Sequence, residues 1–94
     1  MKVVWTDPAL KDRENIINFI AEENPYAAVE MDSLFTSAGK SLEKMPDRCR
    51  VGRVIKTGEL VIHKHYLIVY SIDLQCSVVY IKAIVHTSRK YPPI

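Results

Sequence analysis

Glycine and cysteine are both scarce in this sequence, and their spacing excludes several classes of protein. The three glycines, at positions 39, 52 and 58, form neither of the glycine-rich loops that bind nucleotide phosphates through backbone amides. Cys49 and Cys76 do not form a C-x-x-C pair, and no histidine pair accompanies them at the spacing of a zinc site. We therefore expect two reduced cysteines that pack within the protein, no metal and no cofactor.

Long apolar runs are also absent. The run Tyr66–Tyr70 is far shorter than the roughly 20 residues of a membrane-spanning helix. Lys2 leads directly into the strand-like Val3–Trp5 rather than into the apolar segment of a signal peptide. We expect a cytoplasmic protein that does not associate with membranes. The chain of 94 residues is 48% hydrophobic and 26% charged, which fits one globular domain, residues 1–94.

Basic residues are few in the first part of the chain, and acidic residues are few in the rest. Residues 1–39 carry three basic and seven acidic side chains, a net charge of −4, whereas residues 40–94 carry ten basic and four acidic ones, a net charge of +6. A basic half can bind nucleic acid, a nucleoprotein assembly or an acidic protein. The same asymmetry fits solvated faces that happen to segregate, and composition alone favours neither interpretation.

The first half of the chain predicts a short strand followed by a helix. Asp7-Pro8 is typical of a helix start, with a capping Asp before a Pro at the first helical position. Apolar residues at intervals of three and four carry this helix to about Glu23, with Ile16 and Ile20 facing inward.

A second helix follows at once, because Asn24-Pro25 repeats the same stop and start signals. Its apolar residues recur at alternating intervals of three and four and end at Pro46: Ala28, Met31, Phe35, Ala38, Leu42 and Met45. Two helices joined by so short a turn form a hairpin.

Strand patterns dominate after the basic, turn-rich residues 46–58, which fit a long loop or an irregular edge strand. Three β runs, Glu59–His63, Tyr66–Ile72 and Ser77–His86, predict an antiparallel meander. Both alternating sets of Tyr66–Ile72 are largely apolar, so we expect this strand to be central and covered at least in part on both faces. The predicted fold class is α+β: a short N-terminal strand and a two-helix hairpin packed on a small antiparallel β-sheet.

Three stretches of the sequence are informative when taken in order. The first runs from Trp5-Thr6-Asp7-Pro8-Ala9 through Ile16–Ala21 to Asn24-Pro25 and Ala27-Ala28. The second joins Gly58–Ile62 to Tyr66–Tyr70, and the third is Ile81, Ile84-Val85-His86, Arg89 and Tyr91-Pro92. In this order they resemble the ParE branch of the RelE/ParE toxin superfamily, the toxins of bacterial type II toxin–antitoxin pairs.

The resemblance implies a small sheet flanked by an N-terminal helical hairpin, and an antitoxin that masks the toxin. ParE-like toxins inhibit DNA gyrase and trap its cleaved-DNA state, whereas RelE-like relatives on the same fold cut mRNA in the ribosome. Because two chemistries share the fold, function has to be argued from the site.

A metal-independent endoribonuclease would need a base, an acid and cations for the developing phosphorane charge. The candidates for this chemistry are His86, Arg89 and Tyr91, with Arg53, Lys56, His63 and His65 as further basic groups. No carboxylate follows Asp73, so a base would have to be a histidine. We interpret His63 and His65 as solvent-facing residues that bracket a turn. Alternation along the last strand places His86 in phase with Lys82 and Ile84, and His86 fits a strand-end histidine as well as a functional one.

The hypothesis that we favour is a binding toxin that engages DNA gyrase without chemistry of its own. Its expected target-binding residues are His86, Arg89, Lys90, Tyr91 and Pro92. Arg89 fits equally well an ion pair with Glu14 or Glu22 of the first helix. The alternatives are the ribosome-dependent endoribonuclease, whose targets are the ribosome and mRNA, and a non-toxic partner that acts only as a co-repressor with its antitoxin.

The small domain cannot cover every apolar side chain, so an antitoxin surface is also expected. We predict that Phe19, Leu34 and one sheet edge contact the antitoxin, with Arg50 and Arg53 facing its acidic residues. The expected antitoxin is a ribbon-helix-helix protein with an acidic, apolar C-terminal arm, and operator DNA is contacted only through it. Trp5, Tyr66 and Tyr70 are expected in the core or in cross-strand pairs rather than as stacking platforms for bases.

Overall fold

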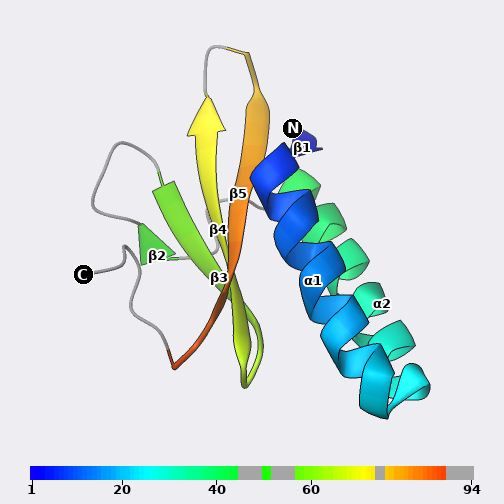
Figure 1. Cartoon of the computed structure of the whole chain (residues 1–94). Coiled ribbons are helices and arrows are strands. Elements are labelled where there is room, and N and C mark those ends of the chain that lie inside the picture. The colour runs from blue at the N-terminus through cyan, green and yellow to red at the C-terminus, as the bar shows by residue number, and fades with distance from the viewer. Residues whose placement is uncertain (45–49, 52–56, 74–75, 89–94) are drawn as a thin grey trace.

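The computed structural model of the chain describes residues 1–44, 50–51, 57–73 and 76–88 (Figure 1). Its elements follow in chain order: β1 (Lys2–Trp5), α1 (Asp7–Glu23), α2 (Pro25–Lys44), β2 (Arg50–Val51), β3 (Thr57–His63), β4 (Tyr66–Asp73) and β5 (Val78–His86). Both predicted helices, the short N-terminal strand and the three later strands are therefore confirmed, with bounds within two residues of those expected. The expected edge strand is β2, two residues long. No helix in the described ranges is long and apolar enough to cross a membrane.

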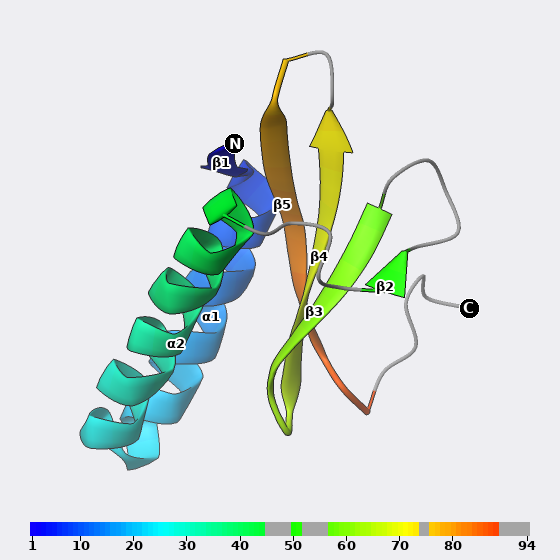
Figure 2. The ribbon, with the colours of Figure 1, turned by 180° about the vertical axis from the view of Figure 1, so that it is seen from behind.

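The described strands form one sheet in the order β1-β5-β4-β3-β2. Strands β3, β4 and β5 make the expected antiparallel meander, with β4 at the centre, and β2 extends it antiparallel to β3. Strand β1 lies parallel to β5 at the other edge, so the sheet is mixed rather than wholly antiparallel. The α+β class is confirmed, since α1 and α2 run side by side across one face of the sheet (Figures 1 and 2).

Side-chain caps set the ends of the helices. Thr6, rather than the expected Asp7, is the N-cap of α1: its Oγ1 accepts from the Ala9 N–H at 3.4 Å and donates to the Ile81 carbonyl at 2.7 Å. The same hydroxyl thus starts the helix and ties it to β5. Asn24 separates the helices as predicted, because its N–H donates to the Ile20 carbonyl and its Oδ1 accepts from the Ala27 N–H at 3.1 Å.

The core lies between the helical hairpin and the sheet. It is formed by small residues and large apolar ones from α1, α2, β4 and β5: Ala9, Met31, Phe35, Ala38, Leu42, Ile68, Tyr70, Val79, Ile81 and Ile84. The apolar stripe predicted for the second helix supplies four of these ten residues, and Ile16 and Ile20 pack against them as expected. Met45 and Pro46 lie outside the described residues.

Arg13 joins three elements on the helical side of this core. Its guanidinium donates to the Asp32 carboxylate at 2.9 Å and to the Thr36 hydroxyl at 2.8 Å. The same group lies 4.8 Å from the centre of the Trp5 ring and 5.6 Å from that of Phe35. Trp5 is therefore part of the packing between β1 and the hairpin, as expected.

A β-bulge changes which side chains of β5 face the helices. Val69 pairs with Ala83 and Tyr70 with Ile81, so Lys82 is an extra residue without a partner in the ladder. The sequence alternation had placed Lys82, Ile84 and His86 on one continuous face, and this prediction is wrong. Lys82 is exposed, whereas Ile84 and His86 join the helix-facing side of the sheet.

Cys76 is a free cysteine as predicted, but the prediction that it packs within the protein is wrong, because it is exposed in the β4–β5 turn. Its backbone N–H donates to Asp73 Oδ1 at 3.2 Å, and the Asp73 charge raises the pKa of the thiol. The raised pKa favours the neutral thiol over the thiolate. Cys49 lies outside the described residues.

Replacing Gly58 with Ala is expected to destabilise the fold by about 2 kcal/mol. A Cβ at this position would lie 2.5 Å from the Cζ and hydroxyl of Tyr70, its cross-strand partner, and Tyr70 is too buried to move aside. Gly39→Ala is the matched control, since its Cβ would lie 3.2 Å from the Trp5 ring nitrogen and the gain in helix propensity, about 1 kcal/mol, offsets a small shift. Urea unfolding of both variants checks the difference, and equal midpoints would contradict it.

Candidate functional site

A groove of about 490 Å³ lies between α1 and the end of the sheet where β4 begins and β5 finishes. Its lining side chains are Asp12, Asn15, Ile16 and Phe19 from α1, Tyr66 from β4, Ile84 and His86 from β5, and the following Ser88. The α1 residues stand at intervals of three, one and three, so they form one stripe along the helix. Two residues predicted for different partners, Phe19 and His86, thus line the same groove.

Phe19 gives the groove its most accessible apolar side. Its side chain is 71% exposed, although Ile16 and Ile20 on the same helix pack against the core. A large aromatic side chain at a groove is a favourable anchor for a partner, because its transfer out of water contributes free energy on binding. This observation supports the docking role predicted for Phe19.

Asp12 connects α1 to β5, which forms the opposite wall of the groove. Its Oδ2 accepts from the Ile84 N–H at 3.1 Å, a partly buried hydrogen bond between α1 and β5. Ile84 lies two residues beyond the bulged Lys82. This hydrogen bond therefore fixes β5 just after the bulge, where the alternation of its side chains between the two faces of the sheet is reversed. Asp12 therefore positions Ile84 and His86 against α1.

The hydrogen bonds of His86 determine which ring nitrogen carries its proton. Its Nδ1 accepts from the Ser88 N–H at 3.2 Å and lies 2.7 Å from the Ser88 hydroxyl. A ring nitrogen that accepts from a backbone N–H is unprotonated, so the neutral imidazole carries its proton on Nε2. In this arrangement Nε2 is a hydrogen-bond donor to a partner and cannot serve as a general base.

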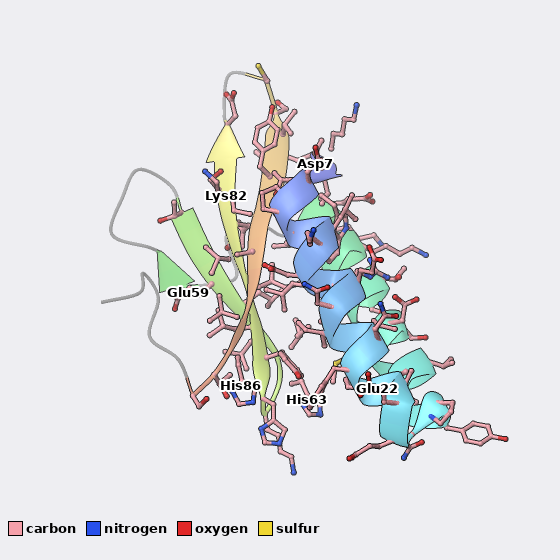
Figure 3. All side chains as sticks on the ribbon, in the orientation of Figure 1. Asp7, Glu22, Glu59, His63, Lys82 and His86 are labelled. Carbon is pink, nitrogen blue, oxygen red and sulfur yellow. The ribbon has the colours of Figure 1, made fainter. Side chains whose placement is uncertain are left out.

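His63 and His65 bracket the β3–β4 turn as predicted, and His63 lies at the same end of the sheet as His86 (Figure 3). The ring centres of His65 and His86 are 5.4 Å apart with an interplanar angle of 18°, and those of His63 and His65 are 5.5 Å apart. Desolvation, then the charges of Lys64, His63 and His86, lower the pKa of His65 below its ordinary 6.5. This grouping of three histidines was not expected, because the sequence places His86 more than 20 residues from the turn.

The other predicted site residues lie apart from the groove or outside the described residues. Leu34 is on α2, 38% exposed, and does not line the groove. Arg50 lies in the short edge strand β2. The remaining predicted contacts fall outside the described residues: Arg53, Arg89, Lys90, Tyr91 and Pro92.

Sequence reasoning did not identify Asp12, Asn15 or Tyr66 as groove residues. The spacing of Asp12 and Asn15 relative to Phe19 is that of one helix face, so the stripe was visible in the sequence. What was not visible is the strand that faces it. In the described ranges, no cluster of three or more His, Cys, Asp or Glu residues could hold a metal ion.

Comparison with known proteins agrees with this architecture. A family model described as the ParE toxin of a type II toxin–antitoxin system, parDE, matches residues 3–91. The chromosomal ParDE toxin–antitoxin system of P. aeruginosa is similar with a TM-score of 0.75 and 18% identity, over 92% of this chain and 95% of that chain. The RelBE2 toxin–antitoxin complex of Mycobacterium tuberculosis is similar with a TM-score of 0.62 and 19% identity, over 90% and 95%. No curated protein matches the sequence.

Proposed function

Because the chain belongs to the ParE toxin family of type II toxin–antitoxin systems, we propose that it inhibits DNA gyrase and that an antitoxin neutralises it by occupying the groove between α1 and β5. The observation that carries this proposal is the convergence of Phe19 and His86 on one groove. An antitoxin segment anchored on Phe19 covers His86, so the antitoxin and the target compete for the same surface.

The geometry of His86 supports binding rather than acid–base chemistry. General acid–base catalysis needs a nitrogen that can take up and release a proton at the reacting atoms. The Nδ1 of His86 accepts a hydrogen bond from Ser88, and its Nε2–H is a donor. This donor suits a hydrogen bond to a carbonyl or carboxylate of a protein target. The proposed target surface combines this donor with Arg89, Lys90, Tyr91 and Pro92.

The proposed antitoxin is a ribbon-helix-helix protein whose acidic, apolar C-terminal arm lies on this toxin. Phe19 would receive an apolar side chain of the arm, and Leu34 would be a second contact outside the groove. Arg50 and Arg53 belong to the half of the chain with a net charge of +6, so they would steer the acidic residues of the arm. Operator DNA would be bound through the antitoxin alone.

Induction of the protein in bacteria without its antitoxin tests the proposed target. Inhibition of gyrase predicts a DNA damage response and filamentous cells, with intact mRNA. Rapid arrest of translation with cut mRNA would replace the proposal with the ribosome-dependent endoribonuclease. Unchanged growth would favour the co-repressor alternative.

A further inference from the structure

The three histidines at the end of the sheet are linked by contacts that depend on their protonation. The His65 N–H donates to His63 Nδ1 at 3.1 Å, and the Ser88 N–H donates to His86 Nδ1 at 3.2 Å. Both acceptor nitrogens must be unprotonated for these bonds to exist. A proton on either Nδ1 replaces the acceptor with a donor that faces another donor, and the bond is lost.

The same residues connect the β3–β4 turn to the end of β5. The Thr87 N–H donates to the His65 carbonyl at 2.8 Å, and the Thr87 hydroxyl donates to the Lys64 carbonyl at 2.8 Å. The rings of His65 and His86 stack, and those of Tyr66 and His86 meet in a T-shaped arrangement with ring centres 5.4 Å apart. Tyr66, His86 and Ser88 also line the groove, so this connection forms one end of it.

The positive charges of its neighbours oppose the protonation of His65. Lys64 lies on the turn between His63 and His65, and each protonated histidine adds a positive charge to the stack. From α1, Asp12 faces the same groove as His86, and Glu22 lies toward this end of the molecule (Figure 3). Within the part of the chain that the structure describes, no ion pair joins a carboxylate to any of the three histidines. Protonated His65 and His86 would therefore repel each other across the stack.

We propose that His63, His65 and His86 form a pH-sensitive latch, which closes the end of the groove when the rings are neutral and opens it when they are protonated. Acidification removes two hydrogen bonds and turns the ring stack from attractive to repulsive. The lowered pKa of His65 has the matching sign: at pH values just below 6.5 the unfolded chain binds a proton that the closed form does not. The closed form is therefore fully favoured above that range and loses stability as the pH falls through it. If the groove binds the antitoxin, the complex weakens in acid, and this consequence alone rests on the proposed function.

Amide hydrogen exchange of the isolated, isotope-labelled protein tests the latch without any partner. After correction for intrinsic exchange rates, protection of the His65, Thr87 and Ser88 amides should fall roughly tenfold from pH 7.5 to pH 5.5. Protection of the Ile68 and Ile81 amides, in the middle of β4 and β5, should stay constant over the same range. Equal protection of the latch amides at both pH values would overturn the proposal.

Matched substitutions separate the latch from a general effect of acid. In the double variant His63→Asn and His86→Asn, Oδ1 takes the place of Nδ1 as an acceptor and cannot be protonated at these pH values. Its His65 and Ser88 amides should therefore keep their protection in acid, whereas the double Gln variant, with the acceptor one bond further out, should lose protection at both pH values. A pH dependence that persists in the Asn variant would contradict the latch. The ¹⁵N shifts of the wild-type rings give an independent check, because His63 and His86 must both carry their neutral proton on Nε2.

Discussion

Phe19→Asp is expected to raise the Kd of the antitoxin complex by roughly 100-fold, or about 2.7 kcal/mol. The side chain is 71% exposed at the groove, so the free toxin loses little when it is replaced. The complex loses an aromatic anchor and gains a carboxylate that must be desolvated in the groove that Asp12 also lines. Most of the change should appear as faster dissociation, because the substitution removes a contact made only after the partners have docked.

Tyr26→Asp is the matched control for this prediction. Tyr26 is another aromatic residue on the hairpin, 84% exposed, and it does not line the groove. Calorimetric or surface-resonance titration with the purified antitoxin should give the wild-type Kd for this variant. Equal losses of affinity in both variants would show that the antitoxin binds the hairpin by general hydrophobicity rather than at the groove.

Deletion of residues 89–94 is expected to abolish growth inhibition while leaving the fold and antitoxin binding intact. The segment carries two cations, Arg89 and Lys90, and the Tyr91-Pro92 pair proposed to contact the target. The buried apolar residues that the structure describes end at Ile84, so the truncation leaves them in place. Colony counts after induction measure toxicity, and urea unfolding together with antitoxin titration measures the rest.

A substitution within the segment distinguishes a lost contact from a lost length of chain. Arg89→Ala with Lys90→Ala keeps every residue but removes both positive charges, and it should weaken toxicity in a salt-dependent manner. A truncated protein that still arrests growth would place the target surface elsewhere, with His86 and the groove as the remaining candidates.

Local patterns in the sequence were sufficient for most of the fold. Apolar residues at helical spacing identified α2 and its core residues Met31, Phe35 and Leu42, because each helix turn returns the same face to the core. The cap of α1 was assigned one residue late, since Thr6 and Asp7 are both good N-caps and only the bond from Thr6 to the Ile81 carbonyl distinguishes them. The parallel pairing of β1 with β5 joins the two ends of the described chain, and no local signal reports it.

The site was less predictable because it depends on a bulge and on distant contacts. Strict alternation along β5 placed His86 in phase with Lys82, and the extra residue at the bulge reversed that relation. Phe19 was predicted as an antitoxin contact and His86 as a target contact, but their common groove follows only from the packing of α1 on β5. The histidine cluster likewise requires the β3–β4 turn and the end of β5 to meet, as the Thr87 to His65 hydrogen bond shows.

If one groove serves both the target and the antitoxin, the two must compete in a DNA cleavage assay with purified gyrase. Supercoiled plasmid is incubated with gyrase, ATP and the full-length protein, and linear DNA trapped by denaturation is measured while antitoxin is added. Linear DNA should accumulate with the toxin and disappear as the antitoxin fills the groove. It should persist when the toxin is Phe19→Asp, because Phe19 is proposed to contact the antitoxin, whereas gyrase is proposed to contact His86 and residues 89–94. Linear DNA that persists at saturating antitoxin with the wild-type toxin, or that never forms while mRNA is cut on ribosomes, would contradict it.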